Sequence, residues 1–540
     1  MMTAPMESDC LGPAGLPHTT RLYAAYLEHF SRVAEFYEHV PTLDGIARAA
    51  ASVRLDANIR QGVVDVLREQ NRAWGRGPDV SRSLDRLAEG SVAVVTGQQV
   101  GLFGGPAYSV YKALTALHLA DELTSRGTPA VAVFWMATED HDLAEVSHCA
   151  FGTRSGPERF ELAPSDGAGR LVGEIPLGDA VRGLVDRAKE LLEGPDSGAV
   201  AAWLEQAYRP QETYSAAFAK LLTNVFSGRG LIVLDPMSPK LHHFAAPILR
   251  RALEEHAEIA RELVARNKRL ERDGFHSQVK VVERSTLLFR VVNGKRLPLK
   301  PKNSGLAAGA LVESLAEALL ALDRAPEDFS PSALLRPVVQ DALLPTAAYI
   351  GGSAEIAYLA QASVVYRRLL GRMPAVLPRA GFTLVDPHVA RLMKKYNVAL
   401  TDVFSGRQKL RAKLDRETLP KSFARRFDDG NKALRRTLAR LRTPLGKLDH
   451  TLLGALDTAE KKMLYQFTHL REKAGRAEAF RTGVLDAHER ELLGMLYPHH
   501  ALQERSLCFL PFFAAHGTDL LNRLEKKIQI GSGNHCVIHL

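Results

Sequence analysis

A run of ionisable side chains, TEDHD at residues 138–142, directly follows the apolar segment VFWMA. Such a cluster can act as acid and base, orient an amine or bind a metal, and an Asp beside a His can fix the imidazole tautomer. A metal site would add His148 and Cys149, although Cys149 is equally a small buried hydrophobe. Alternatively, Thr138 or Asp140 caps the helical segment DLAEV, and the other acids suit its dipole. A cap needs only one such residue, so we predict a functional cluster and no metal.

A glycine-rich loop is the second candidate site, in SVAVVTGQQVGLFGGPAYSVYK at residues 91–112. Its N–H groups can approach an anion closely because several positions carry no side chain, and the following helix adds its positive N-terminal end. The loop matches neither G-x-G-x-x-G nor the Walker A pattern. We predict that it holds a phosphate or a carboxylate, and a tight turn packed under a helix stays open as the alternative.

The third group of polar residues lies late in the core. Arg336 and Gln340 are four residues apart and share a helix face, with Asp341 beside them. Their flanking positions are apolar, which favours burial around a ligand over a surface helix. Glu355 begins a later helix and Arg379 follows a strand, so each is either a site residue or a partner in a cap or ion pair.

These residues need a framework of parallel strands. The order strand, glycine loop, helix (107–126), strand predicts one right-handed βαβ unit. In open parallel sheets, ligands bind beyond the carboxyl ends of the strands, which is where the polar clusters lie. The expected strands are 92–95, 130–136, 230–236, 346–350 and 375–377, and the expected helices between the last three are 239–272, 332–343 and 354–370.

Other segments surround this sheet. Residues 18–90 show apolar residues at helical spacing, and QVKVVERSTLLFRVVNGKRLPLK alternates like a hairpin whose turn is Asn293-Gly294. We therefore expect a helical lead-in at 1–90, the first half of the core at 91–150, a first connecting insertion at 151–228, a core strand and helix at 229–272, a second insertion at 273–330, the second half of the core at 331–386, an α-helical coiled coil at 387–500 and a tail at 501–540 that returns to the core.

The region beyond residue 386 is rich in Lys, Arg, Leu and Ala, and it keeps helical periodicity over many turns. We expect two long helices, broken near Asp428 to Gly430 and again near Thr482-Gly483, which form an antiparallel or intermolecular coiled coil. Charge on such helices is more often a solvated face than a nucleic-acid site.

Composition narrows the class of protein. The 540 residues exceed one ordinary core, 46% of them are hydrophobic, and the net charge of +9 favours anionic ligands without implying nucleic acid. The start, MMTAPMESDCLGPAGLP, has no apolar region typical of a secretory signal, and no uncharged run is long enough to span a membrane. The four widely spaced cysteines, Cys10, Cys149, Cys508 and Cys536, argue against a disulfide framework and for a reducing compartment. We predict a cytoplasmic protein.

Three blocks of this sequence resemble the bacillithiol-biosynthesis cysteine-adding enzymes, the BshC family. The blocks are TGQQVGLFGGPAYSVYK, then VFWMATEDHDLAEV, then LLRPVVQDALLPTAAYIGGSAEIAYLAQ with MPAVLPRAGFTL, and the resemblance covers nearly the whole chain. It implies an α/β fold with a Rossmann-like, nucleotidyltransferase-type parallel core related to class I aminoacyl-tRNA synthetases, two inserted connecting subdomains and a C-terminal α-helical coiled coil through which members dimerise. The implied activity is that of a ligase joining L-cysteine by an amide bond to the glucosamine amine of glucosaminyl-malate, giving bacillithiol.

The resemblance also implies site residues. From it we expect His141, with Asp140 or Asp142, to take the proton from the glucosamine nitrogen, and Glu139 or Glu355 to hold the cysteine ammonium. Ser353 replaces the proline usual in the family's GGPAE segment, so we expect a looser loop with no side-chain function lost. The matching positions are Thr96, Gly97, Gln98, Gln99, Gly105, Tyr108 and Lys112 in the first motif, Trp135, Glu139, Asp140, His141 and Asp142 in the second, and Arg336, Gln340, Asp341, Tyr349, Gly351, Gly352, Glu355 and Arg379 in the third.

Amide formation from a free carboxylate needs activation, so we expect ATP or another nucleotide as cofactor, with its phosphate or the malyl carboxylates held by the glycine loop and Lys112. The expected partners are L-cysteine, glucosaminyl-malate and a second copy of the chain, with no membrane and no nucleic acid. Two alternatives stay open: a synthetase-like RNA-binding protein that uses the basic coiled coil, and a non-catalytic scaffold. The intact TGQQ and EDHD clusters speak against the scaffold.

Overall fold

The computed structural model describes residues 10–162, 167, 169–418 and 421–540. Residues 1–9, on which the prediction about a secretory signal partly rested, lie outside this set. The chain divides into two compact units. The first contains the described residues up to Phe151, Glu158–Thr383 and Glu504–Ile538, and the second contains Gly152–Pro157, Leu384–Gln503 and His539–Leu540. The division into eight segments made from the sequence stays a prediction.

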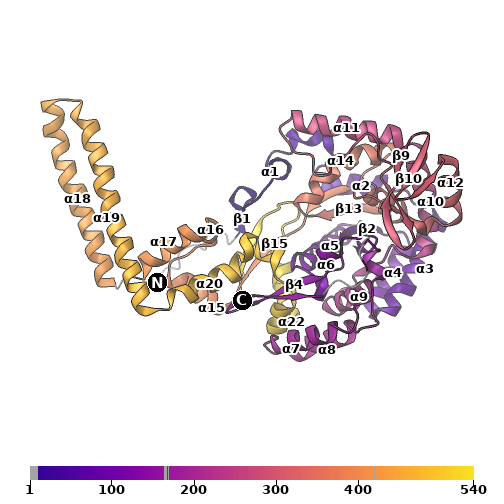
Figure 1. The fold of residues 1–540 in the computed structure, drawn as a ribbon, viewed down its shortest axis with the longest axis horizontal. Helices are drawn as coiled ribbons and strands as arrows, with labels where there is room; N and C mark the ends of the chain where they lie inside the picture. Colours follow the sequence, from indigo (N-terminus) through magenta and orange to yellow (C-terminus); the bar gives the residue numbers. More distant parts are fainter. Residues whose placement is uncertain (1–9, 163–166, 168, 419–420) are drawn as a thin grey trace. The chain divides into compact units, whose positions relative to one another are not determined.

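A five-stranded parallel sheet forms the centre of the first unit (Figure 1). Its strand order is β14-β13-β2-β3-β6, and each neighbouring pair is parallel. The strands are apolar and almost wholly buried, as expected of a parallel sheet covered on both faces. All five predicted strands are confirmed, and their observed bounds are Val92–Gln98 for β2, Ala130–Met136 for β3, Ile232–Leu234 for β6, Thr346–Gly351 for β13 and Ala375–Pro378 for β14.

Helices pack against this sheet at the positions expected from apolar periodicity. The stretch predicted as one helix at 239–272 is two helices that meet at Glu255. Helix α13 begins four residues later than predicted because Pro337, which lacks an N–H, favours the first turn of a helix. The observed helices are α1 Arg21–Glu28, α2 Leu43–Ser52, α3 Ala57–Ala73, α4 Pro78–Ala88, α5 Tyr108–Ser125, α10 Pro239–Glu254, α11 His256–Arg272, α13 Arg336–Leu343 and α14 Ser353–Leu369.

Two groups of elements interrupt the sheet in sequence. The first comprises β4 (His148–Thr153), β5 (Gly156–Glu161) and the helices α7 (Val181–Glu190), α8 (Ser197–Ala207) and α9 (Tyr214–Val225). The second contains the predicted hairpin, formed by β7 (Leu288–Val292) and β8 (Lys295–Pro298). Asn293 and Gly294 form its turn, both with positive φ. The remaining elements of this group are β9 Lys300–Lys302, β10 Gly305–Ala308, β11 Leu311–Glu313, α12 Leu315–Arg324 and β12 Phe329–Pro331.

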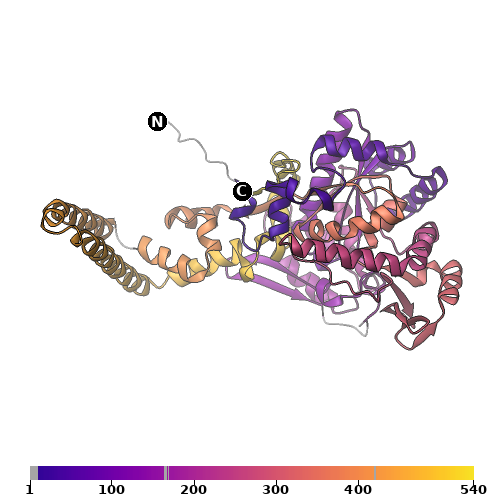
Figure 2. The same ribbon diagram turned by 90° about the horizontal axis from the view of Figure 1, so that it is seen from above.

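The second unit is helical. Helices α18 (Lys421–Leu448) and α19 (Leu452–Thr482) lie side by side as a long pair in Figures 1 and 2. The predicted break near Thr482 is confirmed, whereas the break predicted at Asp428 to Gly430 is wrong because α18 runs through it. A Cβ on Gly430 would lie 2.6 Å from the ring of Phe467, so this glycine allows close packing of the two helices. The shorter helices of this unit are α15 Pro387–Lys395, α16 Leu400–Phe404, α17 Arg407–Glu417 and α20 Leu485–Leu496.

One disulfide corrects the prediction drawn from the cysteines. Cys10 in β1 (Cys10–Leu11) is bonded to Cys536 in β16 (His535–His539), and these residues are paired in an antiparallel register. Cys149 and Cys508 are free and buried. The pair was missed because 526 residues separate its members, and spacing along the chain gives no sign that the two ends form adjacent strands.

Within the described residues, no helix has both the length and the apolar character needed to cross a bilayer. Helix α22 (Leu510–Glu525), in the tail of the chain, packs on α5 and α8 of the first unit.

Two glycines of α19 provide a test of the helical packing. A Cβ on Gly475 would lie 1.9 Å from the carbonyl oxygen of Asp415 in α17, whereas nothing lies within 4 Å of one on Gly454. Gly475→Ala is therefore expected to destabilise this packing by about 1–3 kcal/mol, and Gly454→Ala to stabilise α19 by about 1 kcal/mol. Hydrogen exchange of the full-length protein would measure both opening free energies. Equal protection in the two variants would contradict the close approach.

Candidate functional site

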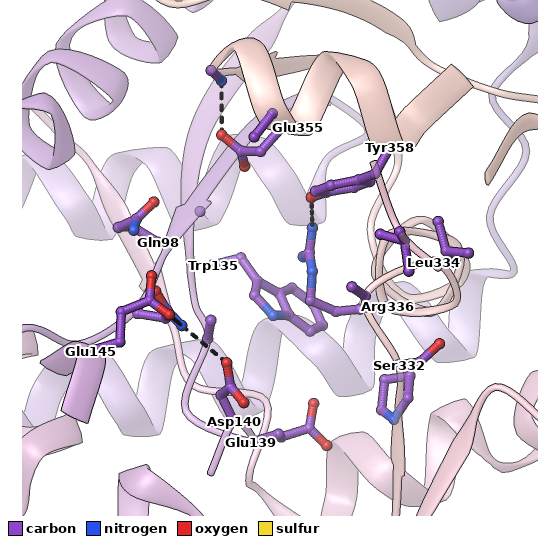
Figure 3. A pocket seen from close by; sticks show the side chains of 18 of the residues that line it. Gln98, Trp135, Glu139, Asp140, Glu145, Ser332, Leu334, Arg336, Glu355 and Tyr358 are labelled. Carbon is purple, nitrogen blue, oxygen red and sulfur yellow. Dashed lines mark hydrogen bonds between the residues drawn. The ribbon is translucent and has the colours of Figure 1, made fainter. Parts of the chain in front are cut away.

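A cavity of about 710 Å³ opens beyond the carboxyl ends of the parallel strands in the first unit (Figure 3). Gln98 is the last residue of β2, and Glu139 follows β3 after a two-residue gap. Glu355 follows β13 after a three-residue gap, and Arg379 follows β14 directly. The cavity is thus at the edge where open α/β sheets bind their ligands.

Most of the predicted site residues line this cavity. Those that do are Gly97, Gln98, Gln99, Tyr108, Lys112, Trp135, Glu139, Asp140, His141, Arg336, Tyr349, Gly352, Glu355 and Arg379. The structure does not bring Thr96, Gly105, Asp142, Gln340, Asp341 or Gly351 to the cavity wall.

Two of the residues outside the cavity have structural contacts instead. The Thr96 hydroxyl donates to the carbonyl oxygen of Ile350 at 2.9 Å and so ties β2 to β13. Asp142 caps helix α6 (Leu143–Val146) by accepting the N–H of Glu145 at 3.2 Å. Capping was the alternative weighed for this cluster, and it falls on Asp142 rather than on Thr138 or Asp140.

The glycine-rich loop is closed by its own hydrogen bonds. The Gly104 N–H donates to the Gly101 carbonyl at 3.1 Å and to the Tyr208 hydroxyl at 3.1 Å, and the Gly105 N–H donates to the Leu102 carbonyl at 2.9 Å. These N–H groups therefore do not face a ligand. The part of the loop that lines the cavity is Gly97 to Gln99.

Lys112, which is buried, and Glu355, whose side chain is 17% exposed, form an ion pair in the cavity wall. The Lys112 ammonium also donates to the Gly97 carbonyl at 2.8 Å and to the Gln98 side chain at 2.9 Å, which accounts for its three hydrogens. Burial tends to raise the pKa of Glu355, but Lys112, the Gly352 N–H and the Tyr349 hydroxyl hold that pKa below its usual value. Lys112 is thus committed to Glu355 and is not available for a ligand anion.

Arg336 differs from Lys112, Arg296 and Arg379, the cations of the wall that are paired with carboxylates. Its guanidinium donates to Gln340 at 2.9 Å and to the Tyr349 and Tyr358 hydroxyls at 3.4 Å, and Figure 3 shows it between the Trp135 ring and Tyr358. These partners, all neutral, are the only hydrogen-bond partners that the described residues provide. Its positive charge therefore suits an anionic ligand.

Gln340 and Asp341 act behind Arg336. Gln340 accepts from Arg336 and donates to the Asp341 carboxylate at 2.9 Å, and Asp341 accepts from the Tyr366 hydroxyl. All three of these supporting side chains are buried. They fix the position of the arginine and do not themselves contact the cavity.

Two buried polar atoms of lining residues lack a partner. Within the described part of the chain, neither the Trp135 Nε1 nor the Ser332 Oγ has a hydrogen-bond partner. Buried polar groups are rarely left unsatisfied. A water enclosed beside these atoms, or a ligand that displaces their neighbours, would satisfy them.

Arg296, which was not predicted from the sequence, contacts the acidic cluster. From β8 it donates to the Ser330 hydroxyl at 2.8 Å and to the Pro331 carbonyl at 2.9 Å, and its Nη1 lies 3.0 Å from the His141 Nδ1. An arginine only donates, so Nδ1 of His141 accepts, and the neutral ring carries its proton on Nε2. The same Nδ1 lies 3.4 Å from the Asp140 Oδ1, so the structure brings the predicted His141–Asp140 pair together, and the role of His141 as a base stays a prediction.

The neighbouring carboxylates are held differently. Asp140 accepts from the Gln99 amide at 3.0 Å and from the His141 backbone N–H at 2.8 Å, and Arg296 lies 3.6 Å from it. Glu139 is buried, and burial raises its pKa against the opposing charges of His242 and Arg296. Glu139 is therefore the carboxyl of this cluster best placed to accept a proton.

The sequence contained signals for some of the missed residues. Tyr358 lies three residues after Glu355, on the same helix face. Arg296 lies just after the predicted Asn293-Gly294 turn, but nothing along the chain connects that hairpin with the acidic cluster. Within the described residues, no group of three or more His, Cys, Asp and Glu side chains is arranged to hold a metal ion.

The Lys112–Glu355 pair predicts a dependence of stability on pH. Because the folded-state pKa of Glu355 is lowered, its contribution is fully present above the unfolded-state pKa and is lost as the pH falls through the folded-state pKa. Lys112→Met leaves a mostly buried carboxylate unpaired and is expected to lower the free energy of unfolding by about 3–5 kcal/mol at neutral pH. This loss should shrink in acid, where the carboxyl becomes neutral.

Urea denaturation at neutral and acid pH would measure these differences. The control is Lys112→Met combined with Glu355→Leu, which removes both charges and should recover most of the lost stability. A single variant no less stable than the double variant would show that the pair is not a mostly buried ion pair.

Two family models together match nearly the whole chain. The model of the family "Bacillithiol biosynthesis BshC, N-terminal Rossmann-like domain" matches residues 6–380, and that of "Bacillithiol biosynthesis BshC, C-terminal coiled-coil domain" matches residues 382–540. These matches confirm the expected fold class, a Rossmann-like α/β core followed by a coiled coil.

Individual relatives match over nearly their full length. The protein named "Putative cysteine ligase BshC" from Koribacter versatilis is 41% identical over 96% of this chain and 97% of its own. Those of the same name from Solibacter usitatus and Salinibacter ruber are 40% and 32% identical, over 99% and 97% of this chain and 100% and 97% of their own. The chain therefore belongs to the BshC family of bacillithiol biosynthesis.

Proposed function

We propose that this protein is a cysteine ligase of bacillithiol biosynthesis, which joins L-cysteine through an amide bond to the glucosamine amine of glucosaminyl-malate. Membership of the family and the name of its relatives support this class of reaction. The observation that carries the proposal is the position of Arg336, a cation with neutral partners, in the same cavity as the buried carboxyl of Glu139. Amide formation needs a bound carboxylate and an amine that loses a proton.

The roles follow from these contacts. Arg336 binds a carboxylate of the substrates, with the free Trp135 N–H as a further donor. Glu139 accepts the proton that the attacking amine loses, and His141 donates from Nε2. Glu355 is already paired with Lys112 and is therefore not proposed to hold the cysteine ammonium.

A nucleotide is the proposed activating cofactor. When bound, ATP would supply the activation of the cysteine carboxylate. Arg336 and the exposed Lys280 and Arg505, which line the same cavity, suit its phosphates by charge. The N–H groups of Gly104 and Gly105 are used within the protein, so we place the phosphates at these side chains rather than at the glycine-rich loop.

We also propose a cytoplasmic homodimer. The cytoplasmic location follows from the small-molecule substrates, although disulfides are uncommon in that compartment. Exposed apolar side chains recur at seven-residue spacing on each long helix of the second unit, Leu441 and Leu448 on α18 and Met463 and Leu470 on α19. A second copy of the helical pair would cover these side chains as in a coiled coil.

Deletion of the gene tests the reaction. Mass spectrometry of cellular thiols should show accumulated glucosaminyl-malate and no bacillithiol in the deletion strain, and the reverse after the gene is restored. Arg336→Gln should restore bacillithiol formation about 10- to 100-fold more slowly than the wild type, because a hydrogen bond to a charged group contributes about 1.5–3 kcal/mol. Arg126→Gln, in an exposed pair with Glu122, is the control and should restore the wild-type rate.

Bacillithiol that persists in the deletion strain would overturn the proposed reaction for this chain. Steep salt-dependent binding of tRNA by the purified protein would then favour the RNA-binding alternative.

The dimer has its own test. Leu441→Glu with Leu448→Glu places charges in the proposed interface and is expected to convert the dimer into a monomer in sedimentation velocity. Ala439→Glu with Thr443→Glu changes exposed residues on the opposite side of α18 and should leave the dimer intact. A wild-type protein that sediments as a monomer, or a dimer unaffected by the leucine substitutions, would contradict the proposed interface.

A further inference from the structure

His242 belongs to none of the sequence motifs, yet its ring faces the buried carboxyl of Glu139. It lies on the first turn of α10, and its Nε2 is 3.5 Å from the Glu139 Oε1. The side chains are only 8% and 10% exposed. Two titratable groups are thus enclosed together behind the cavity wall, and only Glu139 lines the cavity itself.

A backbone carbonyl fixes the tautomer of His242. The ring Nδ1 lies 3.2 Å from the Pro326 carbonyl oxygen, which can only accept, so Nδ1 carries a hydrogen. In the neutral ring, Nε2 then carries a lone pair, and this atom is the one 3.5 Å from the Glu139 Oε1. A lone pair and an ionised carboxylate repel each other. One added proton, on either Oε1 or Nε2, therefore stabilises this contact by allowing a hydrogen bond between the two atoms.

The surroundings of Glu139 act on its ionisation in both directions. Burial and Asp235 oppose the ionised form of Glu139, whereas Arg296, Arg336 and a protonated His242 favour it. Asp235 is itself fixed, because it accepts from the Thr138 hydroxyl at 2.6 Å, from Ser215 and from the Met237 N–H at 3.1 Å. Glu139 accepts no hydrogen bond of this kind from the described residues, so its contact with His242 is not already occupied by a donor.

We propose that Glu139 and His242 form a proton-accepting pair, in which His242 is a positioning residue that sets the proton affinity of Glu139. As the amine attacks the activated carboxyl, one of its N–H bonds breaks and the proton passes to the Glu139 carboxylate. It is then shared with the Nε2 of His242 and later leaves to water. Long contacts of this kind commonly shorten when the substrate binds. The identity of the amine rests on the proposed function, whereas the pairing itself does not.

Nuclear magnetic resonance of the full-length protein, labelled with ¹⁵N in histidine, tests the pair independently of any reaction. His242→Gln identifies the ring signals of His242 by their loss. We expect the Nδ1–H tautomer in the neutral ring, and a changed Nε2 chemical shift in Glu139→Gln, because the contact with the carboxylate is lost. An Nε2–H tautomer in the wild type, or an Nε2 chemical shift that Glu139→Gln leaves unchanged, would overturn the pair. If Glu139→Gln does not fold, the tautomer measured in the wild-type protein still tests the proposed pair.

The pH dependence of amide formation from cysteine, glucosaminyl-malate and ATP tests its catalytic use. His242→Gln, whose amide can donate to Glu139 and favour the carboxylate, should move the acid limb of the rate to lower pH. The control His243→Gln changes an exposed neighbour on the same helix and should keep the wild-type profile. An acid limb that does not move would overturn the positioning role. An inactive wild type would instead count against the proposed function, with the resonance experiment still deciding the pair.

Discussion

The parallel alignment of five strands is the constraint on which this site depends. Parallel pairing places every carboxyl end at one edge of the sheet, so the residues that follow each strand meet there although they are far apart in sequence. Glu139 follows β3 and Glu355 follows β13, yet both line one cavity. Because the strands are buried on both faces, this edge is also where polar side chains can gather without disrupting the core.

Gathering charges at a buried edge requires that they be compensated. Lys112 is paired with Glu355, Arg379 with Glu504 and Arg296 with Asp140. These pairs build the wall of the cavity and hold its shape. Arg336 differs from these three cations, because its hydrogen bonds within the described residues go to neutral groups. A cation of the wall without a carboxylate partner is suited to a ligand anion.

The acidic cluster shows how position changes the role of similar side chains. Asp142 caps a short helix, Asp140 is held by an amide and a backbone N–H, and Glu139 is buried beside a histidine. His141 is held by a residue of the inserted hairpin, because the guanidinium of Arg296 lies within hydrogen-bonding distance of its ring. The insertion is thus part of the cavity wall, because Arg296 lines the cavity and contacts the cluster.

The sequence by itself determined the order of strands and helices, since apolar runs and helical periodicity are local properties; β3 was predicted with its observed bounds. The motif residues and the family were also readable, because they lie in continuous blocks. Only the tertiary structure decided what depends on contacts across the chain. Gly430 packs against Phe467 instead of breaking a helix, Cys10 meets Cys536 across 526 residues, and Arg296 and His242 join a cluster from which they are remote in sequence. Spacing along the chain carries no information about such neighbours, because folding alone brings them within bonding distance.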